Sequence, residues 1–247
     1  LKYKIKCVIN LAAQPGVRVS YAKPYKTLSE NILTFINIIE CSRIFKVKRF
    51  IYASSSSVYG DTKRLPFHED DKNINPISIY GASKLSNEII AKSFSTNFNM
   101  QCIGLRFFTV YGPYGRPDMA YFKFLLKNKE NKKINIYNMG RMLRDFTYID
   151  DIILAIKKII NKKIIDKNII LNVGKGKPDK LDDLIFFLQK FGQLNFKKNF
   201  INSFPAGDVK KTFSSNIKIK KLLGWNPNTS LKKGIEKFCK WYKNFYN

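Results

Sequence analysis

The sequence contains few of the residues that hold metals or form disulfides. Of its 247 residues, four are cysteine and one is histidine. The cysteines (Cys7, Cys41, Cys102 and Cys239) are far apart and show no metal-ligand or Cys-x-x-Cys spacing. Each lies in an apolar segment, so we expect four small buried side chains in a protein of the reducing cytoplasm. The single His68 stands beside consecutive acids without a ligand geometry, so we expect a surface loop residue and no metal site.

Long apolar runs and acidic residues are also scarce. No apolar run reaches the roughly 18 residues that a membrane-spanning helix requires, so no membrane association is expected. Lys and Arg number 45 against 18 Asp and Glu, which gives a net charge of +27. Such a charge is typical of proteins that bind nucleic acid. The lysines, however, are scattered through every segment without a block or a DNA- or RNA-binding motif. We therefore expect attraction of anionic small molecules and no nucleic-acid partner.

The first half of the chain alternates between two patterns. Short β-branched runs at 6–11, 49–54 and 101–108 predict buried strands. Helical periodicity at 27–45 and 77–98 predicts helices between them. This order indicates an α/β fold with a parallel sheet and right-handed crossovers, in which ligands bind at the carboxyl ends of the strands.

After Gly112 the pattern changes. Pro113, Gly115 and Pro117 mark a loop. Helices are expected to begin at 120–126 and to cover 181–191 and 231–246, strands to cover 134–137 and 169–173, and a strand followed by a helix to fill 146–160. We predict a division into residues 1–112, which form the sheet domain, and residues 113–247, which form mainly a smaller α/β substrate-binding region.

The stretch with the clearest chemistry runs from Phe50 to Lys84. An apolar segment ends abruptly in the hydroxyls of 54–57, as at the end of a buried strand. Tyr80 and Lys84 then share one face of a helix. A phenol near pKa 10 is a poor base at neutral pH, but a neighbouring ammonium stabilises the phenolate, and a serine can share the proton. A Tyr-x-x-x-Lys pair alone also fits a plain surface helix. The serine-ended strand before it favours a device that moves a proton to or from a substrate hydroxyl.

Five segments together resemble a known family. They are 10–14 (NLAAQ), 54–60 (SSSSVYG), 80–84 (YGASK), 105–118 (LRFFTVYGPYGRPD) and 144–151 (RDFTYIDD). In these the sequence is similar to the extended short-chain dehydrogenase/reductases of the NAD-dependent epimerase/dehydratase type, and most similar to their UDP-glucuronate 4-epimerase branch. The resemblance covers nearly the whole chain and keeps its order.

The resemblance implies a Rossmann-like, doubly wound sheet and NAD as cofactor. It implies C4 epimerisation of UDP-glucuronate to UDP-galacturonate through a transient 4-keto sugar, with no net oxidation. It also implies a homodimer joined through the helices at 27–45 and 77–98, and a role in polysaccharide biosynthesis.

The resemblance also assigns roles to single residues. Ser55, Tyr80 and Lys84 would be catalytic, with Ser56 as the alternative to Ser55. Tyr80 would act as the base, and Lys84 would hold the nicotinamide ribose and lower the pKa of Tyr80. The remaining cofactor contacts would be Leu11, Ala12, Ala13, Asn31 and Phe107. Ala12 and Ala13 fit equally well as close-packing residues.

The substrate contacts are implied in the same way. A carboxylate pocket would be built from Ser56, Ser57, Thr109 and Arg116, because hydroxyls and a guanidinium bind a uronate through charge-assisted hydrogen bonds. Thr109 and Arg116 also fit a strand end and a solvated loop cation. Arg144 would meet the diphosphate and Asp208 the ribose. For Arg18, contact with the diphosphate, contact with the uronate and a surface position all stay open.

One element of the expected family is missing from the sequence. Dinucleotide-binding folds open with a strand, a glycine-rich turn and a helix that receives the pyrophosphate. No G-x-G-x-x-G or G-x-x-G-x-x-G run precedes Lys6, and Gly174-Lys175-Gly176 stands in the wrong context. We therefore expect a fragment that lacks two βαβ units, about 60 to 80 residues at ~30 residues per unit.

We considered three alternatives to the uronate epimerase. A 4,6-dehydratase would carry an Asp-Glu pair for proton relay where Ser56 and Ser57 stand, so dehydration lacks its acid. A neutral-sugar 4-epimerase usually carries Asn in place of Thr109. A chain without the pyrophosphate loop could also be an inactive fragment that binds nucleotide sugars.

Overall fold

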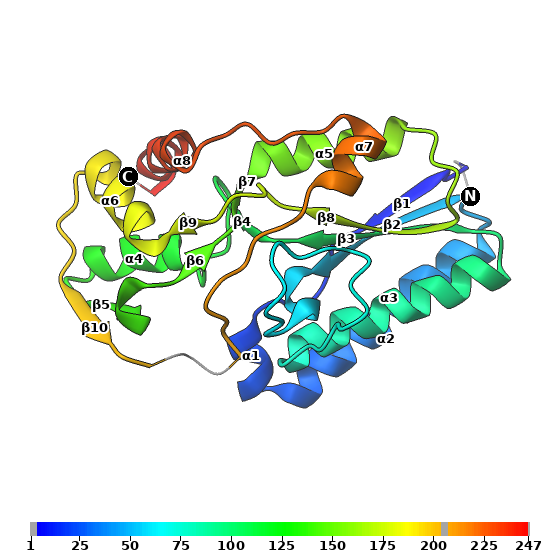
Figure 1. Ribbon diagram of the computed structural model, residues 1–247, viewed down its shortest axis with the longest axis horizontal. Helices are drawn as coiled ribbons and strands as arrows, with labels where there is room; N and C mark the ends of the chain where they lie inside the picture. The colour runs from blue at the N-terminus through cyan, green and yellow to red at the C-terminus, as the bar shows by residue number, and fades with distance from the viewer. Residues whose placement is uncertain (1–3, 204–206, 247) are drawn as a thin grey trace.

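A parallel four-stranded sheet forms the centre of the computed structural model, which describes residues 4–203 and 207–246 (Figure 1). The strand order is β1-β2-β3-β8. The bounds are Cys7–Asn10 for β1, Arg49–Ser55 for β2, Gln101–Phe107 for β3 and Asn168–Val173 for β8. Isoleucines lie opposite one another across all four strands, at positions 9, 51, 103 and 169.

Helices cover both faces of this sheet (Figure 1). Helices α2 (Pro24–Ile44) and α3 (Ile79–Asn97) lie on one face, and α5 (Ile149–Asn161) and α7 (Ile217–Leu223) on the other. Successive side chains of a strand point to opposite faces, so Phe50 and Tyr52 join the α2–α3 core while Ile51 joins the α5–α7 core. Burial on both faces explains why these strands read as continuous apolar runs. The expected doubly wound α/β fold is confirmed.

Glycine is required at one point in the middle of the sheet. A Cβ added to Gly104 of β3 would lie 2.6 Å from the hydroxyl oxygen of Tyr52 and 2.5 Å from Cδ1 of Ile170. Only a residue without a side chain leaves room there for the Tyr52 ring on the neighbouring strand.

A second region has its own core. It contains α4 (Ala120–Lys129), β5 (Ile134–Tyr137), α6 (Leu181–Gly192), β10 (Lys198–Ile201) and α8 (Leu231–Tyr246). β10 pairs in parallel with β5. The core between these elements is rich in aromatic rings, among them Phe122, Phe124, Phe196 and Phe238.

Short strands connect the two regions. β4 (Thr109–Tyr111) pairs in parallel with β7 (Phe146–Tyr148), and β6 (Leu143–Arg144) pairs antiparallel with β9 (Asp179–Lys180). The chain after residue 112 serves both regions, because α5, β8 and α7 return to the central sheet. The chain leaves the central sheet after Phe107 and returns to it at β8, so the residues after 112 contribute to both regions.

Helix starts depend on local signals. Helix α2 begins at Pro24, three residues before the start expected from periodicity, because proline in the first turn has a preset φ and no N–H to leave unpaired. The Ser78 side chain caps α3 by accepting a hydrogen bond from Gly81 N at 3.0 Å. The six-residue helix α1 (Val17–Ala22) was not anticipated.

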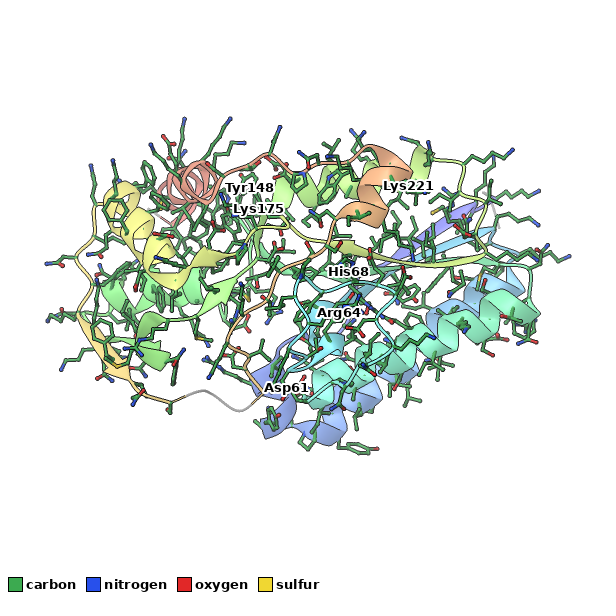
Figure 2. All side chains as sticks on the ribbon, in the orientation of Figure 1. Asp61, Arg64, His68, Tyr148, Lys175 and Lys221 are labelled. Carbon is green, nitrogen blue, oxygen red and sulfur yellow. The ribbon has the colours of Figure 1, made fainter. Side chains whose placement is uncertain are left out.

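The structure also places the four cysteines and His68. Cys102 and Cys239 are buried and Cys7 partly so, but Cys41 is exposed on α2, so the expectation of four buried cysteines was wrong for Cys41. His68 is partly buried on the loop between β2 and α3, where Figure 2 labels it with Asp61 and Arg64. Within residues 4–203 and 207–246, no helix is long and apolar enough to cross a membrane.

Candidate active site

A cavity of about 930 Å³ lies where β1, β2 and β3 end, between the sheet and the second region. Its lining comes from the segments after these strands, from α1, from the loop before α4 and from β5. Twelve of the fourteen residues predicted to form the site line it: Leu11, Ala13, Ser55, Ser56, Ser57, Tyr80, Lys84, Phe107, Thr109, Arg116, Arg144 and Asp208.

The serine run forms a tight turn at the end of β2. Ser55 ends the strand, and a short 3₁₀ helix follows at Ser56–Tyr59. The Ser55 Oγ accepts a hydrogen bond from Ser57 N at 3.1 Å and donates one to Ser57 Oγ at 3.2 Å. Ser54 instead donates to the buried carboxylate of Glu88, with 2.5 Å between the oxygens. Of the hydroxyls in this turn, Ser55 is the one that acts on the pKa of Tyr80, which favours Ser55 over Ser56 as the partner of the phenol.

Helix α3 brings Tyr80 and Lys84 to this turn. The Lys84 side chain is almost fully buried, and its Nζ donates a hydrogen bond to Ala53 O at 3.0 Å. The same Nζ lies 5.9 Å from the centre of the Tyr80 ring. The helix approaches closely because residue 81 is glycine: an added Cβ would lie 2.5 Å from Ser57 O.

The pKa values of both groups are shifted by burial. Burial raises the pKa of Tyr80 above its ordinary value, while side-chain hydrogen bonding with Ser55 and the charge of Arg116 act in the opposite direction. Burial lowers the pKa of Lys84 to about 8. Lys84 therefore still carries its charge at neutral pH.

Two predicted cofactor contacts do not line the cavity. Asn31 of α2 is buried and holds the loop after β1: its Oδ1 accepts from Gln14 N at 2.7 Å, and its Nδ2 donates to Gln14 O and to Ser83 Oγ. Ala12 is exposed, and its N–H donates to Asn10 Oδ1 at 3.1 Å. Asn31 therefore supports the loop that presents Leu11 and Ala13 to the cavity.

A second set of polar groups lines the same cavity. Arg116 belongs to the loop between β4 and α4. Its Nε and Nη2 donate to the two carboxylate oxygens of Asp118, at 2.9 and 2.5 Å. A Cβ added to Gly16 would lie 3.4 Å from Arg116 Nη2, so the guanidinium reaches the loop that precedes α1.

Two arginines around one carboxylate also line the cavity. Arg144 Nη2 donates to Asp208 Oδ1 at 2.9 Å, and Arg18 Nη2 lies 3.6 Å from Asp208 Oδ2. Burial lowers the pKa of Arg144, and the charge of Asp208 opposes that shift. Arg18 also lies over the Tyr137 ring, 5.1 Å from its centre. The structure thus places Arg18, whose position the sequence left open, in the lining of the cavity.

Sequence reasoning missed two lining residues of β5, Asn135 and Tyr137. Their neighbours Ile134 and Ile136 are fully buried. The period-two alternation of this strand is the signal that could have identified them.

A buried carboxylate supports this end of the site. Asp145 is fully buried and accepts hydrogen bonds from Thr147 Oγ1, from the backbone N–H groups of Lys175 and Gly176, and from both N and Oγ of Ser214. Figure 2 labels Lys175 in this junction between the two regions. Asp145 therefore ties three distant segments together directly beside Arg144.

Comparison with known proteins relates the whole chain to one enzyme family. Residues 1–174 match the model of the NAD dependent epimerase/dehydratase family. An uncharacterized protein of Methanocaldococcus jannaschii is 43% identical over 239 residues, which are 97% of this chain and 72% of that protein. A UDP-glucuronate 4-epimerase of Thermodesulfobacterium geofontis is 39% identical over 242 residues, covering 98% of this chain and 73% of the enzyme.

A solved structure shows the same relationship. The UDP-glucuronic acid 4-epimerase of Bacillus cereus, in complex with UDP-glucuronic acid and NAD, superposes with a TM-score of 0.89 at 35% identity. The match covers 98% of this chain and 76% of that one.

Proposed function

The chain belongs to the NAD dependent epimerase/dehydratase family, and from this premise we propose that it epimerises a UDP-uronic acid at C4, interconverting UDP-glucuronate and UDP-galacturonate. One observation carries the proposal. The proton-transfer group of Ser55, Tyr80 and Lys84 and a hydroxyl-rich set that includes Arg116 line the same cavity.

The lining of the cavity fits the cofactor at its sheet end. Leu11, Ala13 and Phe107 supply small or apolar surface beside the strand ends. Lys84 has three N–H donors, and one of them is used by Ala53 O, so donors remain for ribose hydroxyls. Leu11, Ala13, Lys84 and Phe107 would therefore hold the nicotinamide half of NAD. When bound, NAD supplies a reversible hydride acceptor for C4 of the sugar.

Three residues of this chain transfer the proton of the sugar 4-hydroxyl. Tyr80 accepts the proton of the sugar 4-hydroxyl and later returns it to the 4-keto sugar. The Ser55 hydroxyl hydrogen-bonds to Tyr80 and shares that proton. The Lys84 ammonium, with its Nζ 5.9 Å from the centre of the Tyr80 ring, favours the phenolate through its charge.

Other residues of the same cavity bind the uronate and the nucleotide. Ser56, Ser57, Thr109 and Arg116 can donate hydrogen bonds to the C6 carboxylate, and fixing that group keeps C4 in front of Tyr80 through the turnover of the sugar. Arg144 and Arg18 offer planar guanidinium donors to the diphosphate, and Asp208 accepts from the ribose hydroxyls.

The proposal extends to a homodimer joined through α2 and α3. Exposed apolar side chains support it: Leu28 and Leu33 on α2 and Ile89 on α3. Light scattering of the purified chain tests this, since a monomer at all concentrations would exclude it.

The activity is tested by incubating the purified chain with NAD and UDP-glucuronate and following the sugar anomeric protons by NMR. We expect UDP-galacturonate to accumulate to equilibrium with no net NADH. A chain that binds NAD but converts UDP-glucose in preference to UDP-glucuronate would refute the proposed substrate.

A further inference from the structure

The loop that carries Arg116 has little to hold it from within. It connects β4 to α4 across residues 112–119. Its internal backbone hydrogen bonds run from Gly115 N to Gly112 O, at 3.2 Å, and from Met119 N to Arg116 O, at 3.2 Å. Tyr114 has φ +57°, a left-handed conformation that costs energy in a residue other than glycine. Contacts from outside the loop are needed to maintain this conformation.

Gly112 and Gly115 pack against Ile149 and Tyr121, and the contacts of Tyr114 come from the other end of the chain. The Tyr114 ring lies 5.0 Å from the Trp241 ring and 5.9 Å from the Phe245 ring, centre to centre. Trp241 and Phe245 are one turn apart on α8 and stack on each other at 5.2 Å. Trp241 is in turn fixed by Phe122 and Phe238 of the second core.

Core formation does not explain this contact. Tyr114 is 78% exposed and Phe245 58% exposed, so their contact buries little surface from water. The Trp241 Nε1–H is buried and has no hydrogen-bond partner among the described residues, a cost that phenylalanine would avoid. The three rings instead hold the backbone of Tyr114 in place, two residues before Arg116.

We propose that α8, through Trp241 and Phe245, positions the Arg116 loop and thereby sets the preference for a uronate over a neutral sugar. The inference rests on the proposed function, because it requires Arg116 to bind the carboxylate. Trp241 and Phe245 are positioning residues. Asp118 fixes the orientation of the Arg116 guanidinium within the loop. If the loop is displaced, the N–H groups of Arg116 therefore move away from the sugar carboxylate.

Binding of two probes tests the proposal without requiring turnover. Isothermal titration calorimetry gives the Kd of UDP-glucuronate and of UDP-glucose for the full chain and its variants. For Phe245→Ala we expect UDP-glucuronate to bind about tenfold more weakly, roughly the loss of one charge-assisted hydrogen bond, and UDP-glucose to bind unchanged. Phe186→Ala on α6 is the matched control, since its ring is 59% exposed, and it should change neither Kd.

A double-mutant cycle separates positioning from general loosening. If α8 acts through Tyr114, the Phe245→Ala substitution should have no further effect on the UDP-glucuronate Kd in a Tyr114→Ala background. Additive effects, or an equal loss for both probes, would overturn the proposal. Thermal unfolding of each variant verifies that the proteins are folded.

Arg116→Ala distinguishes a failure of the proposed role of α8 from a failure of the proposed uronate pocket. If it weakens UDP-glucuronate selectively while Phe245→Ala does not, the role of α8 fails and the proposed function stands. If Arg116→Ala weakens both probes equally, the uronate pocket fails, and the role of α8 fails with it.

Discussion

The Nζ atom of Lys84 lies 5.9 Å from the centre of the Tyr80 ring and is anchored by a hydrogen bond to Ala53 O at 3.0 Å. The ammonium is thus fixed to strand β2 while it faces the phenol on its own helix. Strand and helix must be packed correctly for the proton-transfer group to exist.

Replacing Tyr80 by Phe removes the hydroxyl and little else. We expect epimerisation to fall by about 10²- to 10⁴-fold, the usual contribution of a general acid–base group. The Kd for UDP-glucuronate should stay within about twofold, because the ring and the other lining residues remain. An equal loss of binding would show that the phenol acts structurally.

Arg116→Ala should separate uronates from neutral sugars. Removing a guanidinium that binds a carboxylate should lower kcat/KM for UDP-glucuronate by about 10- to 100-fold, the worth of a charge-assisted pair. Activity on UDP-glucose should change little. Arg141→Ala is the control, because this exposed arginine does not line the cavity. Arg116→Lys should recover only part of the loss, since an ammonium cannot bind the carboxylate through a planar fork.

Lys84 makes stability depend on pH in a defined window. Its pKa falls from 10.5 to about 8 on folding because of burial. Between these values the unfolded chain binds a proton at Lys84 that the folded chain does not, so the contribution of Lys84 to stability rises with pH from about 8 to 10.5. Relative to Lys84→Met, the wild type should gain up to about 3 kcal/mol across this window. Urea unfolding at pH 7, 8.5 and 10 measures the difference, and a difference independent of pH would contradict the shift.

The buried pair of Glu88 and Arg106 should be costly to break on one side only. Arg106 Nη2 lies 2.7 Å from Glu88 Oε2, both side chains are almost fully buried, and Arg106 also lies 4.7 Å from the centre of the Tyr59 ring. Glu88→Ala leaves an unpaired buried guanidinium and should destabilise the fold by about 3–5 kcal/mol.

The double replacement Glu88→Met with Arg106→Met provides the comparison for that pair. It should be markedly less damaging than Glu88→Ala, because no buried charge is left unpaired. The denaturant midpoints of the wild type, of Glu88→Ala and of the double variant measure the two losses of stability. A loss under about 1 kcal/mol for Glu88→Ala would mean that water reaches the pair.

The parts of the site that follow local rules could be predicted from the sequence. Tyr80 and Lys84 are one helical turn apart, and Ser55 ends a strand whose apolar pattern is plain, so their meeting follows from the order of elements in a parallel sheet. The expected strand at 134–137 coincides with β5 for the same reason.

What the sequence could not provide depends on contacts between distant segments. Nothing near Arg18 indicates that it meets Asp208, nor does the surrounding sequence relate Tyr114 to Trp241. Helix α1 is too short for periodicity to be detected. Cys41 was misjudged because its apolar neighbours in α2 suggested burial, while its position on the helix turns it outward.

The return of the chain to the sheet has a consequence for the order of events during synthesis. Strand β8 joins β3 only after residues 108–167 have been made, and the Asp145 carboxylate is bound by the distant Ser214. Contacts so distant along the chain form slowly, because loop closure comes before the energy gained from packing. A nascent chain on the ribosome should therefore assemble β1, β2 and β3 with their helices first. The ability to bind a nucleotide sugar should arise as the final step, once α8 has been released and has packed behind the Arg116 loop.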